Sequence, residues 1–252
     1  MKIQTCLLLL FPLMGNAESV RVIRFADSEP FRMGTVTARR IVHPGLGARK
    51  TTLNFSQSMP GAEFAQHVHD NSDDTILVLE GEVNLRQGDS LRLFKAGECA
   101  FVPSGQIHGT ITAGTGEAIM ISFQNPPDFI LYTGARDSSR PGAAPPKGVI
   151  TPDAVRYVSF RARDGQFSGP GNGSLKSTGS RHLLEKGKSL KSSVKAEGEQ
   201  VLFVWRGGIS LKMSGGATHQ AGERDAVFVQ GAAEFEITSA AAGTELIQIQ
   251  AP

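Results

Sequence analysis

Four side chains with metal-binding chemistry lie in the first half of the chain. His67 and His69 are separated by one residue, Asp74 follows after four intervening residues, and His108 comes shortly after a Pro-Ser-Gly turn. Histidines at i and i+2 of a β-strand point to the same face, because side chains alternate with a period of two. Three imidazoles and one carboxylate on neighbouring strands suit a divalent transition metal in a site that keeps coordination positions open.

Glycine and proline turns frame these residues at fixed distances. The first motif reads Gly61, five residues, His67-x-His69, four residues, Asp74, six residues and Gly81. The second reads Gly97, five residues, Pro103-x-Gly105, two residues and His108. These motifs resemble the two signature motifs of the cupin superfamily. The resemblance implies a small double-stranded β-barrel with one metal ion and assigns its ligands as His67, His69, Asp74 and His108.

The chain departs from the family pattern at two positions. Asp74 stands where the family has Glu, and Thr112 stands where it has Asn. Because aspartate is one methylene shorter than glutamate, Asp74 would bind at longer range or through water, leaving the three histidines most of the metal binding. Asp73 is an adjacent alternative, but counting back from Gly81 favours Asp74.

The ligand set leaves the identity of the metal open among iron, manganese, nickel, copper and zinc, since affinity order alone does not choose between them. Because only neutral imidazoles bind metal, binding should weaken below about pH 6. No catalytic residue is identified: Glu63 and Glu80 lie near the motifs, and both are interpreted as solvated turn carboxylates. Apolar residues that flank the ligands are expected to form a mostly dry barrel mouth: Phe64, Ile76, Val78, Ile107 and Phe123.

The second half of the chain repeats the glycine turns of the first. Gly187 and Gly207 follow Gly61 and Gly81 by 126 positions, and Gly222 follows Gly97 by 125. Glycine turns that recur at one offset indicate a duplicated domain. The chain therefore resembles a bicupin, and the expected fold class is all-β, with two tandem double-stranded β-helix barrels of jelly-roll type.

The repeat also predicts that the second barrel binds no metal. Ser193, Lys195 and Gln200 stand at the positions of His67, His69 and Asp74, and Phe235 stands approximately at the position of His108. A lysine ammonium at a ligand position would repel a cation. The remaining histidines lie outside the motif positions and are interpreted as a solvated turn residue and two surface residues: His43, His182 and His219.

Short apolar or alternating runs separated by glycine turns predict many β-strands, as in a sandwich or barrel. The predicted strands are 20–23, 35–38, 51–55, 75–79, 82–86, 91–94, 99–102, 109–112 and 118–123. Residues 134–153 are rich in Gly, Pro, Ser and Ala, which is a linker composition. The predicted domains are a first barrel over 18–133, this linker, and a degenerate second barrel over 154–252.

The first residues differ from the rest of the chain. Lys2 precedes an apolar run from Cys6 to Met14, which is too short to span a bilayer, and small residues follow. This pattern predicts a signal peptide over residues 1–17, cleavage after Ala17, and a periplasmic or secreted protein. Cleavage would leave Cys99 as the single cysteine, so no internal disulfide can form; its alternating strand suggests a small buried hydrophobe.

Charge limits the expected partners. The net charge is +2 and the basic residues are scattered, so nucleic-acid binding is not supported. No membrane association is expected after cleavage. A small molecule is the expected substrate or ligand, and a homodimer would be compatible with the family's pairing of barrels through edge strands.

Two classes of function remain open. The family resemblance implies metal-dependent dioxygenases, isomerases, decarboxylases and lyases that act on small oxygenated molecules. The arrangement, with metal in the N-terminal barrel alone, resembles quercetin-cleaving dioxygenases, whereas bicupin oxalate decarboxylases keep a metal motif in each barrel. A metal-dependent oxidoreductase of dioxygenase type is therefore favoured, and the alternative is an exported cupin that binds a metal or small ligand without turnover.

Overall fold

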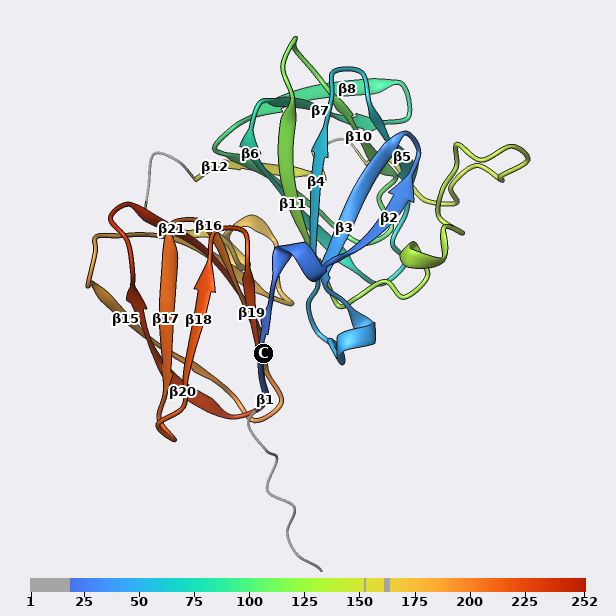
Figure 1. Ribbon diagram of the computed structural model, residues 1–252. Coiled ribbons are helices and arrows are strands. Elements are labelled where there is room, and N and C mark those ends of the chain that lie inside the picture. The colour runs from blue at the N-terminus through green and yellow to red at the C-terminus, as the bar shows by residue number, and fades with distance from the viewer. Residues whose placement is uncertain (1–18, 152, 161–163) are drawn as a thin grey trace, which may run out of the picture.

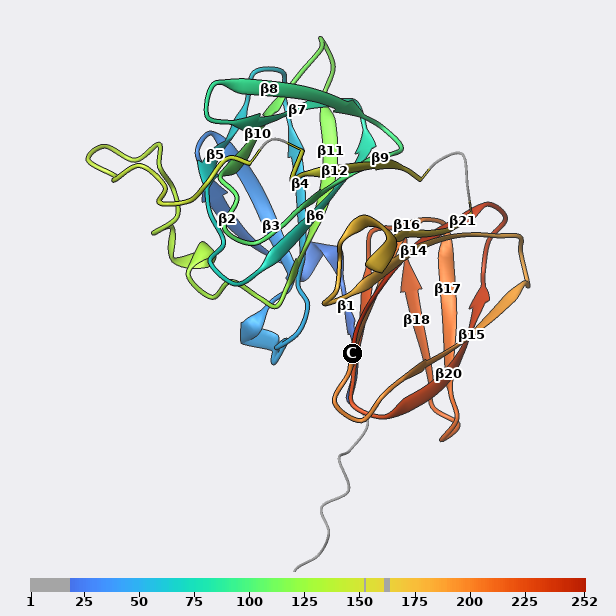
Figure 2. The ribbon, with the colours of Figure 1, turned by 180° about the vertical axis from the view of Figure 1, so that it is seen from behind.

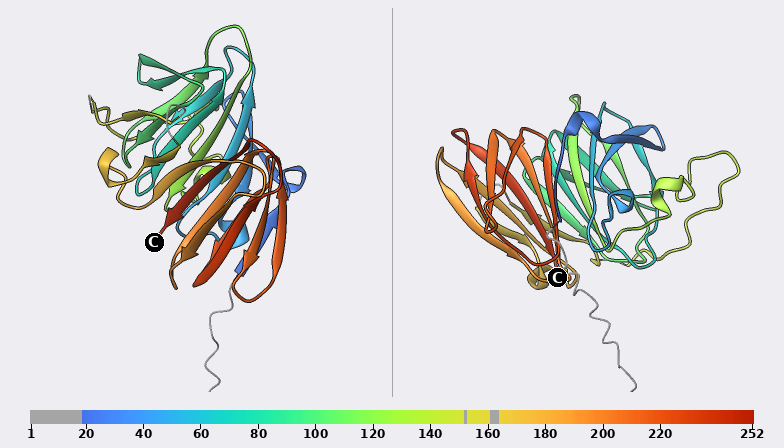
Figure 3. Two further views of the ribbon diagram at one scale, coloured as in Figure 1. Left: turned by 90° about the vertical axis from the view of Figure 1, so that its left-hand side faces the viewer. Right: turned by 60° about the horizontal axis from the view of Figure 1, so that its bottom comes forward.

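The structure, a computed structural model, describes residues 19–151, 153–160 and 164–252. These residues form two β-barrels that lie side by side (Figures 1 and 3). The predicted all-β fold of two tandem barrels is therefore confirmed. The predicted signal peptide lies outside the described residues. The short 3-10 turns in the described part of the chain are η1 Phe25–Asp27, η2 Pro44–Leu46, η3 Leu131–Thr133 and η4 Pro170–Asn172.

The first barrel consists of two antiparallel sheets. The seven-stranded sheet has the order β12-β9-β6-β11-β4-β3-β2, with β2 Glu29–Met33, β3 Val36–Val42, β4 Leu53–Ser58, β6 Asp73–Glu80, β9 Glu98–Val102, β11 Ala118–Asn125 and β12 Arg156–Ser159. The four-stranded sheet has the order β5-β10-β7-β8, with β5 Glu63–His67, β7 Glu82–Gln87, β8 Ser90–Lys95 and β10 His108–Thr112. The strands predicted between residues 75 and 123 are all present, with ends that differ by at most two residues.

The second barrel repeats this design. Its six-stranded sheet has the order β1-β19-β16-β21-β14-β13, with β1 Ser19–Ile23, β13 Gly165–Ser168, β14 Thr178–Leu184, β16 Glu199–Arg206, β19 Ala226–Gln230 and β21 Thr244–Ala251. Its four-stranded sheet has the order β15-β20-β17-β18, with β15 Ser189–Val194, β17 Gly208–Met213, β18 Thr218–Gly222 and β20 Ala233–Ser239.

The first strand of each half pairs with the sheet of the other half. β1 pairs with β19 of the second barrel, from Ser19 opposite Gln230 to Ile23 opposite Ala226. In return, β12 pairs with β9 of the first barrel, as the view from behind shows (Figure 2). The predicted domain boundaries stay predictions, but these pairings show that each barrel takes one edge strand from the other side of the 134–153 segment.

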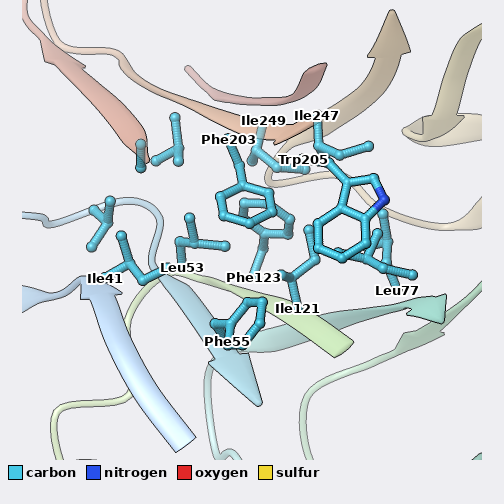
Figure 4. Close-up of a cluster of buried hydrophobic side chains, with 14 of the residues drawn as sticks. Ile41, Leu53, Phe55, Leu77, Ile121, Phe123, Phe203, Trp205, Ile247 and Ile249 are labelled. Atoms are coloured by element: carbon cyan, nitrogen blue, oxygen red, sulfur yellow. The ribbon is translucent and has the colours of Figure 1, made fainter. Parts of the chain in front are cut away.

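A shared apolar core joins the two barrels. The outer face of the seven-stranded sheet packs against the outer face of the six-stranded sheet, and the rings of Phe55 and Phe203 lie 6.4 Å apart between them (Figure 4). β6 is therefore buried on both faces, since Leu77 and Leu79 contribute to this core while Ile76 and Val78 point into the first barrel. This explains why the sequence of β6 is a continuous apolar run rather than an alternating one.

The interiors of the two barrels differ in chemistry. Buried apolar side chains from both sheets fill the second barrel, among them Leu202, Val204, Leu211, Val229 and Ile237. In the first barrel a comparable apolar cluster occupies one part of the interior. The rest of its wall carries buried polar side chains: Asn54, Ser56, Ser58, Thr110, Thr112 and Gln124.

Residues 126–151 run from β11 along the end of the first barrel that carries β5 and the start of β10 (Figure 1). Ser138 donates a hydrogen bond to the carbonyl of Gln66, and Asp137 accepts one from the backbone N–H of Gly34. Farther along, the N–H of Ile107 donates to the carbonyl of Val149. The segment with linker composition thus contacts the strand and the turn that hold two of the predicted metal ligands.

Candidate metal centre

The fold brings the four predicted ligands to one end of the first barrel. His67 is the last residue of β5 and pairs with His108, the first residue of β10. Asp74 lies near the start of β6, in the opposite sheet, and His69 lies just beyond the end of β5. One nitrogen or oxygen atom from each of these four buried side chains lies within 4.8 Å of the others. Their ligation of a metal ion stays a prediction, but the geometry permits it.

The inner atoms of the cluster lie at distances that suit ligands of one ion. His67 Nε2 lies 3.1 Å from His69 Nε2. The nearer oxygen of Asp74, Oδ2, lies 3.5 Å from His108 Nε2 and 3.7 Å from His69 Nε2. Ligand atoms about 2.1 Å from a common ion are roughly 3.0–3.4 Å from each other in octahedral or tetrahedral geometry. The distances involving Asp74 are the long ones, in line with the shorter reach expected for this residue.

Hydrogen bonds orient all three imidazoles with Nε2 inward. His67 Nδ1 lies 2.9 Å from the carbonyl of Ala65, and His108 Nδ1 lies 3.0 Å from the carbonyl of Gln106. His69 Nδ1 lies 2.8 Å from Oδ2 of Asp128. Each of these oxygens accepts a hydrogen bond, so each Nδ1 donates and each Nε2 of a neutral ring carries a lone pair. Three lone pairs thus meet the Asp74 carboxylate inside the barrel.

This arrangement fits a bound cation better than it fits an ordinary hydrogen-bond cluster. Asp74 Oδ1 and His108 Nε2 are buried and have no hydrogen-bond partner. His108 Nε2 faces the other oxygen of Asp74, Oδ2, at 3.5 Å. Leaving buried acceptors unpaired costs free energy unless a cation or a proton binds them. A divalent transition metal would satisfy all four side chains, and mixed nitrogen and oxygen ligands suit such an ion.

The surroundings shift the proton affinities of the cluster in different directions. Burial and the neighbouring imidazoles of His108 and His69 hold the pKa of His67 well below its usual range. Burial also lowers the pKa of His69, but its hydrogen bond to Asp128 and the nearby Asp74 carboxylate outweigh that effect and raise the pKa overall. Burial would raise the pKa of Asp74, but the neighbouring imidazoles of His108 and His69 together outweigh burial and lower the pKa overall, so Asp74 is a carboxylate at neutral pH.

Asp128 is a site residue that the motif spacing does not reveal. It is buried, it holds His69 Nδ1, and its Oδ2 also accepts a hydrogen bond from Arg136 Nε at 3.1 Å. Arg136 in turn donates to Asp70, the neighbour of His69. The one sequence signal was an acidic residue after the Pro-Pro that ends β11, the strand that pairs with the strand of Asp74.

Other sequence interpretations can be compared with the structure. Asp73 points away from the cluster, where its Oδ1 accepts hydrogen bonds from Ser104 and Lys176. Glu63 and Glu80 form ion pairs with Arg86 and Arg206 outside the cluster, so neither is placed as a general base.

Cys99 is buried as predicted, and burial raises the pKa of its thiol to about 12, which makes it a poor nucleophile. The prediction of a solvated His43 was wrong: this ring is 9% exposed, and its Nδ1 accepts a hydrogen bond from the N–H of Gly45. Contact with the Tyr132 ring helps to explain its burial.

The cluster opens on a cavity of about 40 Å³, room for a few water molecules. His67, Asp74 and His108 form part of its wall, with the predicted flanking residues Phe64 and Ile76. Two other predicted flanking residues face elsewhere, since Phe123 belongs to the core between the barrels and Val78 to the apolar interior. The remaining wall residues are Ala38, Asn54, Phe55, Ser56, Gly109, Thr110, Met120, Ile121, Ser122, Gln124 and Leu131.

The second barrel has no such cluster among the described residues. Gln200 is buried on β16, and Phe235 belongs to the apolar interior. The counterpart of His67 is Ser192 rather than Ser193, because Phe235 pairs with Ser192 across β15 and β20. A bulge between His108 and Thr110 in the first barrel shifts the register and accounts for this difference.

A family model for the cupin domain matches residues 55–123, which include the whole cluster. Residues 55–123 of the first barrel therefore form a cupin domain. Two solved structures share the two-barrel cupin fold with the chain. A variant of oxalate decarboxylase from Bacillus subtilis has a TM-score of 0.71 at 12% identity and covers 94% of this chain and 78% of that one. A variant of salicylate 1,2-dioxygenase from Pseudoaminobacter salicylatoxidans, in complex with gentisate, has a TM-score of 0.67 at 14% identity, over 96% of this chain and 84% of that one.

A curated relative matches part of the chain. Tetracenomycin polyketide synthase protein TcmJ from Streptomyces glaucescens is 27% identical over 135 residues, which are 52% of this chain and 90% of the relative. These similarities show the fold and do not assign a reaction. In the described part of the chain no helix is long and apolar enough to cross a lipid bilayer.

Proposed function

We propose that this cupin is an exported, metal-dependent enzyme that acts on a small oxygenated organic molecule by dioxygenase-type chemistry. The observation that carries the proposal is the cluster itself: three histidine nitrogens and one carboxylate oxygen meet beside a cavity. When bound, a divalent metal with open positions would supply Lewis-acid chemistry or a template for substrate and O2.

The residues of the chain have distinct roles in this proposal. His67, His69 and His108 hold the metal through Nε2, and Asp74 adds the negative charge. Asp128 and two backbone carbonyls keep the rings in place through Nδ1. The phenyl ring of Phe64 and the side chain of Ile76 limit the entry of water to the cavity.

Two relatives support the choice of substrates for a first screen. One fold neighbour is a dioxygenase, and the partial sequence relative is a polyketide synthase protein. Polyketides carry carbonyl oxygens at regular spacing, which suits chelation by a metal with two open positions. Diketones, flavonols and small hydroxy acids are therefore the first compounds to test.

A non-catalytic role is the alternative, and the size of the cavity favours it. About 40 Å³ is far less than the roughly 150 Å³ of an engineered cavity that admits benzene, so an aromatic substrate would require the wall to move. In this alternative the protein holds a metal or a small ligand without turnover.

The deciding experiment combines metal analysis with O2 uptake. Purified wild-type protein should contain about one equivalent of metal and consume O2 with a compound from the screen, whereas His67→Ala should do neither. His182→Ala is the matched control, because His182 lies in the second barrel and hydrogen-bonds Gln248. Bound metal without turnover would support the non-catalytic binding role. Protein that binds no metal would exclude both the metal-dependent enzyme and the metal-binding role.

Export is tested separately, by sequencing the N-terminus of the protein from cell fractions. A mature chain in the periplasm or medium that starts at Glu18 would support export. An uncleaved chain confined to the cytoplasm would contradict it.

A further inference from the structure

Three unsatisfied polar atoms meet on the wall of one cavity. In the described part of the chain, seven buried side-chain nitrogen or oxygen atoms have no hydrogen-bond partner. Asp74 Oδ1, His108 Nε2 and Gln124 Oε1 are three of them, and all three residues line the cavity beside the cluster. A metal would account for His108 Nε2, and for Asp74 Oδ1 if the carboxylate binds it through both oxygens. Gln124 Oε1 requires a different partner.

Gln124 lies next to the metal cluster on the polar wall of the barrel. It is 1% exposed and pairs directly with Asp74 across β11 and β6. Its backbone N–H and carbonyl are bonded to Thr52, so the residue is fixed in place. A buried amide oxygen normally accepts a hydrogen bond. Because this oxygen borders a cavity and has no donor from the protein, its donor is expected to come from a ligand.

Asn54 presents a second amide to the same cavity. It faces Ser122 across β4 and β11, and β11 separates β4 from the strand of Asp74. The hydroxyl of Tyr132 donates to Asn54 Oδ1 at 2.9 Å. With its oxygen occupied in this way, the amide of Asn54 has its NH2 group left to donate. Ser56 and Ser122 add hydroxyl groups to the same wall.

The wall around the cluster carries no positive side chain. Among the described residues that line the cavity there is no lysine or arginine, and Asp74 is the one carboxylate. Three neutral imidazoles, one carboxylate and a divalent ion together have a charge of about +1. A chelating ligand with one negative charge would neutralise this site. A ligand with two negative charges would leave one buried negative charge without a partner, which is unfavourable.

We propose that the cavity binds a small chelating molecule that carries a single negative charge at the metal and uncharged hydrogen-bonding groups elsewhere, which Gln124 and Asn54 recognise. The class includes hydroxy-amides, hydroxy-ketones and enolised dicarbonyls, and it excludes small dicarboxylates. This specificity rests on the proposed metal site and adds the substrate class to it. It does not depend on which end of the Gln124 amide faces the cavity, since neither end is charged.

The test compares two probes of similar size that chelate through vicinal oxygens. Acetohydroxamate binds metals as a monoanion and keeps an N–H, whereas oxalate binds as a dianion. Metal content is measured first, and each probe is then titrated calorimetrically into the metal-loaded protein. Each dissociation constant is divided by that for the free metal ion in the same buffer. The protein should favour acetohydroxamate over oxalate by about tenfold or more on this scale.

Gln124→Met should identify the recognising residue, because methionine has a similar volume and offers no comparable donor or acceptor. The variant should keep one equivalent of metal and bind acetohydroxamate about five- to tenfold more weakly, the value of one hydrogen bond. Gln57→Met is the matched control, since Gln57 is an exposed glutamine on β4 that bonds Glu117.

The outcomes separate the specificity from the proposed function. Equal or tighter normalised binding of oxalate, or unchanged acetohydroxamate binding by Gln124→Met, would overturn the specificity. Loss of metal from Gln124→Met would also overturn it, by placing the amide in the metal site. Protein that binds no metal would overturn the proposed function. Selective binding of acetohydroxamate without O2 uptake would support the specificity but assign it to a protein that binds its ligand without turnover.

Discussion

The two barrels share one topology and use their interiors differently. The second barrel is filled by aliphatic and aromatic side chains, whereas the first keeps a polar wall, a cavity and a cluster of unpaired acceptors. Close packing supplies stability, while a cavity with unsatisfied polar atoms reduces it. The comparison shows that the fold does not need the polar interior of the first barrel, and this supports the binding role that we propose for that interior.

The corresponding ends of the barrels show the same contrast at single residues. In the second barrel, Ser192 Oγ donates to Gln200 Oε1 and accepts from Gln248 Nε2, both at 3.1 Å. Donors and acceptors thus face each other at Ser192, whereas Gln200 Nε2 is a buried donor without a partner. In the first barrel, acceptors face acceptors around His67 and Asp74, and only a cation or a proton can reconcile them.

The largest expected effect comes from replacing His108 of the first barrel with phenylalanine, the residue at the corresponding position of the second barrel. His108→Phe removes one imidazole and fills the site with a ring, so bound metal should fall from about one equivalent to almost none. The reverse change, Phe235→His, adds a single ligand and should add no metal. Elemental analysis of both variants checks this. A second equivalent of metal in Phe235→His would show that the second barrel is not degenerate.

The next largest effect concerns whether the two barrels unfold together or independently. Phe203→Ala opens a cavity in the core that both barrels share and should lower the free energy of unfolding by about 3–5 kcal/mol. Unfolding should remain one transition, followed in urea by the fluorescence of Trp205, the single tryptophan, and by release of metal from the first barrel. Leu183→Ala, at a side chain that is 47% exposed, should change stability by less than about 0.5 kcal/mol. Two separate transitions would contradict the shared core.

A smaller effect concerns the residue that orients His69. Asp128→Asn keeps the shape of the side chain but removes the charge that fixes the ring, so the metal dissociation constant should rise about 10–100-fold. Asp70→Asn is the control, because Asp70 bonds the same Arg136 without contacting the His69 ring. Competition titrations with a chelating dye measure both. Equal effects of the two changes would assign the loss to Arg136 instead.

The smallest effect is the dependence on pH. His69 has a raised pKa in the metal-free protein, because Asp128 and Asp74 outweigh the effect of burial, so a proton competes with the metal there as the pH falls through that pKa. The metal affinity should be highest above that pKa and should fall as the pH drops through it, by at most about tenfold per pH unit for one proton. Asp74 adds nothing in this range, because its pKa lies far lower. Metal titrations between pH 8 and pH 5 check this, and constant affinity would rule out His69 as a ligand.

Much of the fold could be predicted because glycine marks its turns. Gly61, Gly81, Gly187 and Gly207 all have φ between 75° and 80°, a region that other residues rarely adopt, and their repetition revealed the duplication. The four clustered residues could be predicted for a related reason, since the motifs place them on adjacent strand ends.

The rest depends on tertiary contacts that leave little local signal. Asp128 reaches His69 from 59 positions away, and no spacing links the two. The exchange of β1 and β12 is decided by which sheet edges are free after folding, which hydrophobic periodicity does not report. The glycine spacing predicts Ser193 as the counterpart of His67, whereas the structure has Ser192 there. The spacing does not reveal the β-bulge in the first barrel that causes this difference of one residue.

The pairing of β1 with β19 has a consequence for the order in which the molecule can be completed. Arg24, just after β1, bonds Asp225, 201 positions farther along the chain. A ribosome makes β1 early, but its partner strand emerges only when most of the chain has been synthesised. The second barrel therefore cannot close its sheet until then, and this long-range step should be slow compared with local hairpins. Until it occurs, the edge of β19 is open to pairing with another chain.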